Sequence, residues 1–167
     1  MMGAYQRALD ITVDDPADTI TSAIVLIMLD RKDDAIKTLE SATWDLPPAI
    51  RKWMESLTLL AQGRRHEALA ATREFTSASY RDPETLYYIA RQLAFLGDHD
   101  AAANLLEQAV HGGFFCAPAL ATDPWLDGLR SNTRFASLLH AAESRTRTSR
   151  TAFLQGGGDE LLGPLDR

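Results

Sequence analysis

The side chains that could do chemistry in this chain are four scattered histidines and a single cysteine. His66 and His99 fall in equivalent turns between expected helices, where a solvated polar residue is usual. His111 and His140 are not accompanied by the set of Cys, His and carboxylate ligands, at short spacing, that a metal site needs. We therefore expect no metal site.

Two further features invite a chemical interpretation. Cys116 has no histidine partner apparent in the sequence, so we interpret it as a buried or half-buried bystander beside Phe114 and Phe115. The glycines at 156–158 follow no strand and precede no Lys-Ser or Lys-Thr pair, which argues against a phosphate-binding loop. The sequence thus predicts no catalytic residue and no cofactor, and a protein that is not an enzyme.

The composition is that of a soluble, helix-rich protein. The 167 residues are 46% hydrophobic and 24% charged. Alanine and leucine are abundant, and runs of β-branched residues are few. A formal charge of −6 argues against a nucleic-acid partner. The most apolar run, 23–29, is too short to cross a membrane. With one cysteine and no signal peptide, we expect a cytoplasmic protein.

Five arginines make the final helix basic. The arginines concerned are Arg130, Arg134, Arg145, Arg147 and Arg150. They fit either a solvated helix face or a docking surface for an acidic partner or nucleic acid. No aromatic residues alternate with the arginines near 145–150, which counts against nucleic acid.

Hydrophobic periodicity predicts paired helices. The clearest pair spans 82–112, where Asp82-Pro83 supplies an N-cap and a first-turn proline, and the turn at 96–99 separates the two helices. Asp15-Pro16 repeats this opening, and Asn132 is the expected cap of the last helix. Further helices are expected at 1–12, 16–29, 34–43, 48–62, 67–78 and 133–154, with an irregular stretch at 114–129 and a frayed turn at 160–163.

The pairs recur with a period of about 34 residues. Ala35, Ala68 and Ala102 follow their turns at intervals of 33 and 34 residues. Gly63 and Gly97 are also 34 residues apart, and Asp30 stands near the same point of the first pair. A helix–turn–helix unit of this length resembles the tetratricopeptide repeat family over residues 1–113.

The resemblance implies an all-α, right-handed α-α superhelix of tetratricopeptide units with a C-terminal capping helix. Half a unit at 1–12 would precede three units at about 15–46, 48–79 and 82–113. Residues 114–167 would form an irregular linker, the long capping helix and a flexible glycine-rich tail. Starting with half a unit suggests a fragment of a longer protein.

The phrase from Asp123-Pro124-Trp125 to Leu138-Leu139 looks like the ending of many bacterial tetratricopeptide regions. Those regions often follow protein-kinase or winged-helix regulatory domains. The likeness implies that Trp125, Leu129 and Phe135 cap the end of the stack.

In this family the first helices of successive units line a concave groove that holds a partner peptide. The matching positions here are Ile20, Ile24 and Ile27 in the first unit, Trp53 and Leu57 in the second, and Tyr87, Arg91 and Phe95 in the third. Some members of the family bind the carboxylate of a partner peptide with Lys and Asn side chains. This chain has Ile24 and Leu57 or Thr58 at those positions, so such a carboxylate clamp is disfavoured.

The function implied is a non-catalytic protein–protein interaction module, which binds a peptide or helix of a partner and belongs to a larger bacterial regulator. The alternative is a structural or oligomerisation segment, a homodimer for example, whose apolar groove is filled by its own chain or by another copy. Neither alternative involves nucleic acid or a membrane.

Overall fold

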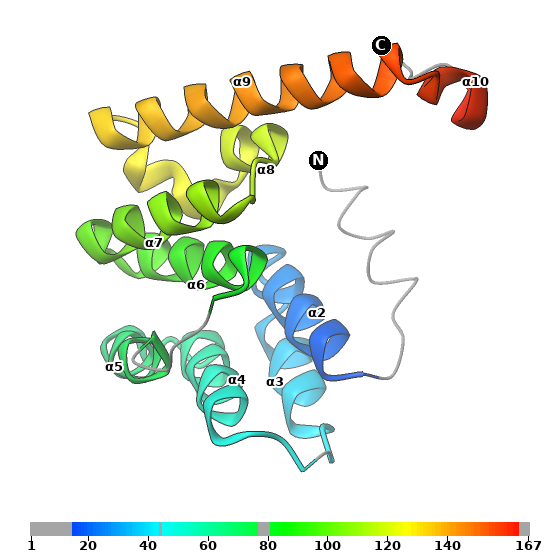
Figure 1. The fold of residues 1–167 in the computed structure, drawn as a ribbon. Coiled ribbons are helices and arrows are strands. Elements are labelled where there is room, and N and C mark those ends of the chain that lie inside the picture. Colours follow the sequence, from blue (N-terminus) through cyan, green and yellow to red (C-terminus); the bar gives the residue numbers. More distant parts are fainter. Residues whose placement is uncertain (1–14, 44, 77–80, 164–167) are drawn as a thin grey trace. The chain divides into compact units, whose positions relative to one another are not determined.

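The computed structural model describes residues 15–43, 45–76 and 81–163. Regular structure in these residues is helical and includes no strand (Figure 1), which confirms the predicted all-α fold. The chain divides into two compact units, Met1–Ser79 and Tyr80–Arg167, so the boundary predicted after residue 113 lies inside the second unit. The helix predicted at 1–12 lies outside the described residues.

The first unit contains two helical hairpins, α2 with α3 and α4 with α5, which pack together through contacts of α4 with α2 and α3. The helices are α2 (Pro16–Met28), α3 (Lys32–Glu40), α4 (Pro48–Ala61) and α5 (Arg65–Thr76). Asp15 caps α2 as predicted, and its Oδ1 accepts a hydrogen bond of 2.8 Å from the Asp18 N–H.

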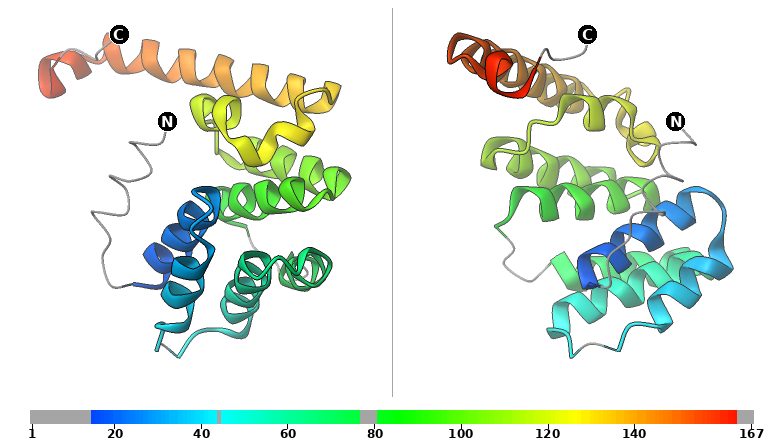
Figure 2. Two further views of the ribbon diagram at one scale, coloured as in Figure 1. Left: turned by 180° about the vertical axis from the view of Figure 1, so that it is seen from behind. Right: turned by 90° about the vertical axis from the view of Figure 1, so that its right-hand side faces the viewer.

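The second unit is one hairpin and the segments that cover it. Its helices are α6 (Pro83–Leu96), α7 (His99–Gly112), α8 (Ala117–Thr122), the 3-10 helix η1 (Pro124–Leu129), α9 (Thr133–Gln155) and α10 (Gly158–Leu162). The 3-10 helix lies against α6 and α7, and α9 packs on α7 and α8 (Figure 2). The predicted caps form: Asp82 accepts from the Thr85 N–H at 2.7 Å and Asn132 from the Arg134 N–H at 2.9 Å.

One turn geometry ends the first helix of all three hairpins. Asp30, Gly63 and Gly97 adopt positive φ angles of 59°, 79° and 98°. The residue after each donates its N–H, at 2.9 Å, to the carbonyl five positions earlier: Arg31 to Leu26, Arg64 to Leu59 and Asp98 to Leu93. These bonds satisfy carbonyls that the helix end would leave unpaired. The three points aligned from the sequence are therefore structurally equivalent.

Small residues allow the paired helices to approach closely. Ala35, Ala68 and Ala102 follow the three turns, and all are 0% exposed. Ala90 of α6 and Ala109 of α7 are also fully buried. A larger side chain at any of these positions would have to push the helices apart.

Some predicted boundaries are wrong. Helix α3 begins at Lys32 instead of Asp34 and ends at Glu40 instead of Thr43, and α5 begins at Arg65 instead of Glu67. Helices start soon after each left-handed turn, so His66 and His99, which were expected in the turns, belong to the first turns of α5 and α7 instead. The stretch 160–163 was predicted as a frayed turn, but residues 158–162 form the short helix α10.

The stretch 114–129 was predicted to be irregular, yet it contains α8 and η1. Its prolines do not interrupt these helices, because Pro118 is the second residue of α8 and Pro124 the first of η1, positions in the first turn where no intrahelical N–H bond is lost. Trp125, Leu129 and Phe135 are buried, and the elements that carry them, η1 and α9, pack on the α6–α7 hairpin. That they cap a repeat array remains a prediction. In the part of the chain that the structure describes, no helix is both long and apolar enough to span a membrane.

Candidate functional site

Three of the predicted groove residues form one row on α6. Tyr87, Arg91 and Phe95 are four residues apart, a spacing that places them on the same face of a helix. We call this row the α6 stripe. All three side chains contact the chain's own segment at 114–125, which we call the cover segment. The structure therefore brings these three predicted residues together, inside the second unit.

Asp123 of the cover segment is the polar centre of this site. Its Oδ2 accepts a hydrogen bond of 2.6 Å from the Tyr87 hydroxyl and lies 2.7 Å from Arg91 Nε. Its Oδ1 lies 3.3 Å from Arg91 Nη2 and accepts a bond of 2.9 Å from the Trp125 N–H. The side chains of Arg91 and Asp123 are only 10% and 4% exposed. Several donors together stabilise a carboxylate that water hardly reaches.

Stacked aromatic rings flank this ion pair. Phe114 stacks on Tyr87 with 4.3 Å between ring centres, and Trp125 stacks on Phe95 at 4.9 Å. The Arg91 guanidinium carbon lies 5.0 Å from the centre of the Trp125 ring, within the range of a cation–π contact. Each member of the α6 stripe thus has an aromatic partner in the cover segment.

Burial raises the pKa of the Tyr87 hydroxyl far above its ordinary value of 10.0, and the Asp123 carboxylate raises it further. The positive charge of Arg91 acts in the opposite direction but is outweighed. At neutral pH the hydroxyl therefore remains a hydrogen-bond donor to Asp123. It is not a candidate general base, and the cluster suits recognition of a carboxylate better than proton transfer.

Sequence reasoning missed Asp123 as a site residue. The signal was present, since the same Asp-Pro pair that opens α2 and α6 also opens η1 at Asp123-Pro124. What no local pattern showed is that the carboxylate also reaches two side chains of α6, which are 32 and 36 residues away in the sequence.

Most of the arginines predicted to form a basic helix face interact with other groups of the second unit. Arg130 donates to the carbonyls of Leu120 at 2.7 Å and Asp123 at 2.9 Å. Arg134 pairs with Glu107 at 2.6 Å, and Arg145 donates to the Val110 carbonyl at 2.7 Å. Arg147 and Arg150 are exposed on α9. All five arginines are exposed, and three of them are also held by groups of the second unit.

The predicted groove residues of the first unit are buried. On α2, Ile20, Ile24 and Ile27 are 4%, 1% and 8% exposed. On α4, Trp53 and Leu57 are 6% and 0% exposed, and Trp53 stacks on Phe75 of α5 with 5.2 Å between ring centres. In this conformation these side chains serve as core, and their role in partner binding remains a prediction.

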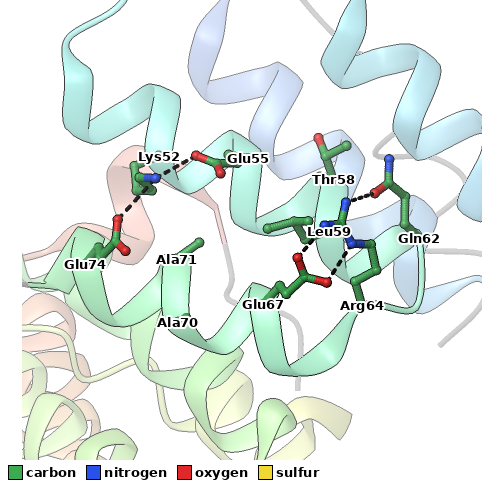
Figure 3. Close-up of a pocket in the computed structure, with 10 residues that line it drawn as sticks. All are labelled: Lys52, Glu55, Thr58, Leu59, Gln62, Arg64, Glu67, Ala70, Ala71 and Glu74. Carbon is green, nitrogen blue, oxygen red and sulfur yellow. Dashed lines mark hydrogen bonds and ion pairs between the residues drawn. The ribbon is translucent and has the colours of Figure 1, made fainter.

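An open hollow of about 530 Å³ lies between α4 and α5 (Figure 3). We call it the α4–α5 furrow; Lys52, Glu55, Thr58, Leu59, Gln62, Arg64, Glu67, Ala70, Ala71 and Glu74 line it. Lys52 lies between Glu55 at 2.8 Å and Glu74 at 3.1 Å. At the other end, Arg64 binds Glu67 and Gln62 (Figure 3). Alanines, and Leu59 beside them, line the space between these charged ends.

The charged pairs of the furrow influence each other's ionisation. Hydrogen bonds to Glu55 and Glu74 raise the pKa of Lys52. The hydrogen bond with Arg64 lowers the pKa of Glu67 and raises that of Arg64. Lys52, Arg64 and Glu67 therefore remain charged at neutral pH, so the furrow presents both signs of charge to solvent.

The prediction that Cys116 is buried or half-buried is wrong, because its side chain is exposed. Cys116 stands just before α8, and that helix buries Ala117 and Leu120 instead. Its thiol lines a shallow apolar hollow of about 390 Å³ with Phe114, Phe115 and Pro118. Within the described residues, no group of three or more His, Cys, Asp or Glu side chains is arranged to hold a metal ion.

Comparison with known proteins adds no relative to this description. No family model, curated protein or solved structure matches the chain. The structure defines a protein of helical hairpins, the last of which is covered by the segments that follow it.

Proposed function

We propose that the chain is a non-catalytic protein–protein interaction module of the tetratricopeptide type, within a bacterial cytoplasmic regulator. The observation that supports this most is the left-handed turn repeated at Asp30, Gly63 and Gly97, because a shared turn at a period of about 34 residues is expected of stacked helical repeats. In this proposal the hairpins form a right-handed superhelix whose surface binds a partner.

The open surface that best fits a partner is the α4–α5 furrow. The small side chains of Ala70 and Ala71 let another helix approach closely, as small residues do between packed helices. Its three carboxylates outnumber its two cations by one, so a basic amphipathic helix matches the excess negative charge. The partner class proposed is therefore a helical segment with an apolar face and basic flanks.

A substitution that fills the furrow tests this function. Ala70 is exposed, so Ala70→Arg places a long side chain in the furrow without disturbing a buried position. The matched control is Ala136→Arg, at an exposed site on α9. Quantitative co-purification should recover the partner with wild type and Ala136→Arg but lose it with Ala70→Arg, all three having the same far-UV circular dichroism. Recovery of the partner with Ala70→Arg would rule out the furrow.

A second candidate function is supported by the burial of the α6 stripe under the cover segment. A segment whose predicted groove is filled by its own chain fits a structural role, as the cap of a helical array. In that case Ala70→Arg leaves every interaction of the protein unchanged. If another copy fills the furrow instead, light scattering at micromolar concentration should give twice the monomer mass, and Ala70→Arg should restore the monomer.

A further inference from the structure

We propose that the α6 stripe is a receptor for an acidic–aromatic peptide, and that Asp123–Trp125 of the same chain occupies it as an intramolecular ligand. This site is separate from the α4–α5 furrow, so the inference does not depend on the function proposed above.

The receptor side and the ligand side come from different parts of the chain. Tyr87, Arg91 and Phe95 project from one face of α6. The groups they bind, the Asp123 carboxylate and the Trp125 indole, belong to a segment that starts beyond the end of α7. The arrangement is that of a helix face recognising a short peptide, except that the peptide is covalently attached.

The contacts define what such a peptide must contain. The carboxylate lies between a phenol donor at 2.6 Å and a guanidinium nitrogen at 2.7 Å. The indole lies against both the Phe95 ring and the guanidinium. One carboxylate followed two residues later by a flat aromatic ring meets both requirements. An amide in place of the carboxylate would leave Arg91 buried without its counter-charge.

Pro124 shapes the ligand. It occupies the first position of η1, where a proline loses no hydrogen bond, and the turn lets Asp123 Oδ1 accept the Trp125 N–H at 2.9 Å. The carboxylate and the indole are therefore held in one capped turn. The class of ligand is an Asp-Pro-aromatic sequence.

Covalent attachment determines how a second ligand would behave. A short tether gives an intramolecular ligand an effective concentration in the ~mM range. A peptide in solution has to compete with that concentration, so its apparent affinity for the wild-type chain is reduced. Weakening the intramolecular ligand should restore the affinity.

The test uses a fluorescein-labelled synthetic peptide with the sequence of residues 120–130 and the full chain. In the double variant Asp123→Asn/Trp125→Ala, fluorescence anisotropy should show binding at least ~10-fold tighter than in wild type. A peptide with Asn in place of its Asp should bind at least ~10-fold more weakly to this variant, because it lacks the charge that faces Arg91. The same variant with Arg91→Gln added should lose the preference for Asp.

The single variant Trp125→Ala provides a second measurement if the double variant does not fold. Saturating peptide should raise its melting temperature, since a ligand that binds only the folded state stabilises it. Equal binding of the Asp and Asn peptides, or no binding and no thermal shift in any variant with native circular dichroism, would overturn the proposal.

Discussion

The hairpins α4–α5 and α6–α7 end their first helices with the same left-handed turn but differ in what covers that helix. Beside α4 the ion pairs remain at the surface, where the side chains of Lys52 and Glu74 are 33% and 65% exposed. On α6 the cover segment buries the corresponding kind of pair, and Arg91 and Asp123 are 10% and 4% exposed. A repeated hairpin sequence therefore specifies the hairpin. Whether the face of its first helix is exposed or buried depends on the segment that follows.

This difference in burial changes the energetic role of an ion pair. Exposed pairs contribute little, because water and salt screen them and their side chains lose entropy. A buried pair is costly to break, since either partner alone would remain as a buried charge. Substitutions that break an ion pair should therefore change the free energy of unfolding much more at the buried pair on α6 than at the exposed pairs beside α4.

Arg91→Ala should have the largest effect. It leaves the Asp123 carboxylate buried without its cation, which should reduce the free energy of unfolding by about 3–5 kcal/mol. Urea denaturation followed by far-UV circular dichroism measures the change. The control is Arg134→Ala, which breaks an exposed pair of the same unit, 50% and 44% exposed, and should cost about 0–1 kcal/mol. Similar losses in both variants would contradict the comparison.

High pH should destabilise the second unit through Tyr87. The unfolded phenol ionises near pH 10, whereas burial raises the pKa of the folded phenol and keeps it protonated to higher pH. The folded state therefore binds more protons above pH 10, and the free energy of unfolding should fall by about 1.4 kcal/mol per pH unit from this group.

Tyr87→Phe should remove that alkaline dependence, at a cost near neutral pH of about 1–2 kcal/mol for the lost hydrogen bond to Asp123. Urea denaturation between pH 8 and pH 11 measures both quantities. The described residues of the first unit include no tyrosine, so hydrogen exchange at high pH should increase in α6 before it increases in α4. An unchanged alkaline slope in the variant would contradict the burial of the hydroxyl.

The repeated turn gives a smaller effect that has opposite signs in the two units. Gly97 has φ of 98°, and no atom lies within 4 Å of the place where an added methyl group would stand. Gly97→Ala should therefore cost about 1–2 kcal/mol through backbone strain alone. Asp30 adopts φ of 59° despite its side chain, so Asp30→Gly should stabilise the first unit by about 0.5 kcal/mol. Thermal unfolding of both variants measures the two shifts, and a loss of stability in Asp30→Gly would show that its carboxylate has an additional role.

The smallest expected effect is at the furrow. Lys52→Ala removes two exposed ion pairs, and we expect the urea midpoint to stay within error of the wild type in 0.5 M salt, where exposed charges are screened. A clear destabilisation that persists in salt would mean that the furrow is stabilised like the α6 site.

Much of the fold could be predicted because its signals are local. The Asp-Pro openings at Asp15 and Asp82 and the turn residue Gly97 act within a few residues of themselves, and each is found in the expected geometry. The helices at 117–129 escaped prediction because prolines normally interrupt helices, and only their first-turn position makes them compatible. The burial predicted for Cys116 was wrong because exposure depends on how the surrounding segment packs, which neighbouring residues do not determine.

By itself, the sequence determined the helices, their caps and the repeated turn, because helical hydrogen bonds and apolar periodicity are properties of neighbouring residues. Only the tertiary structure decided which outer faces are open. The α6 stripe is covered because Asp123 and Trp125 reach back to α6, and such contacts depend on where distant segments meet. The same tyrosine, arginine and phenylalanine on an uncovered helix would be an exposed binding surface.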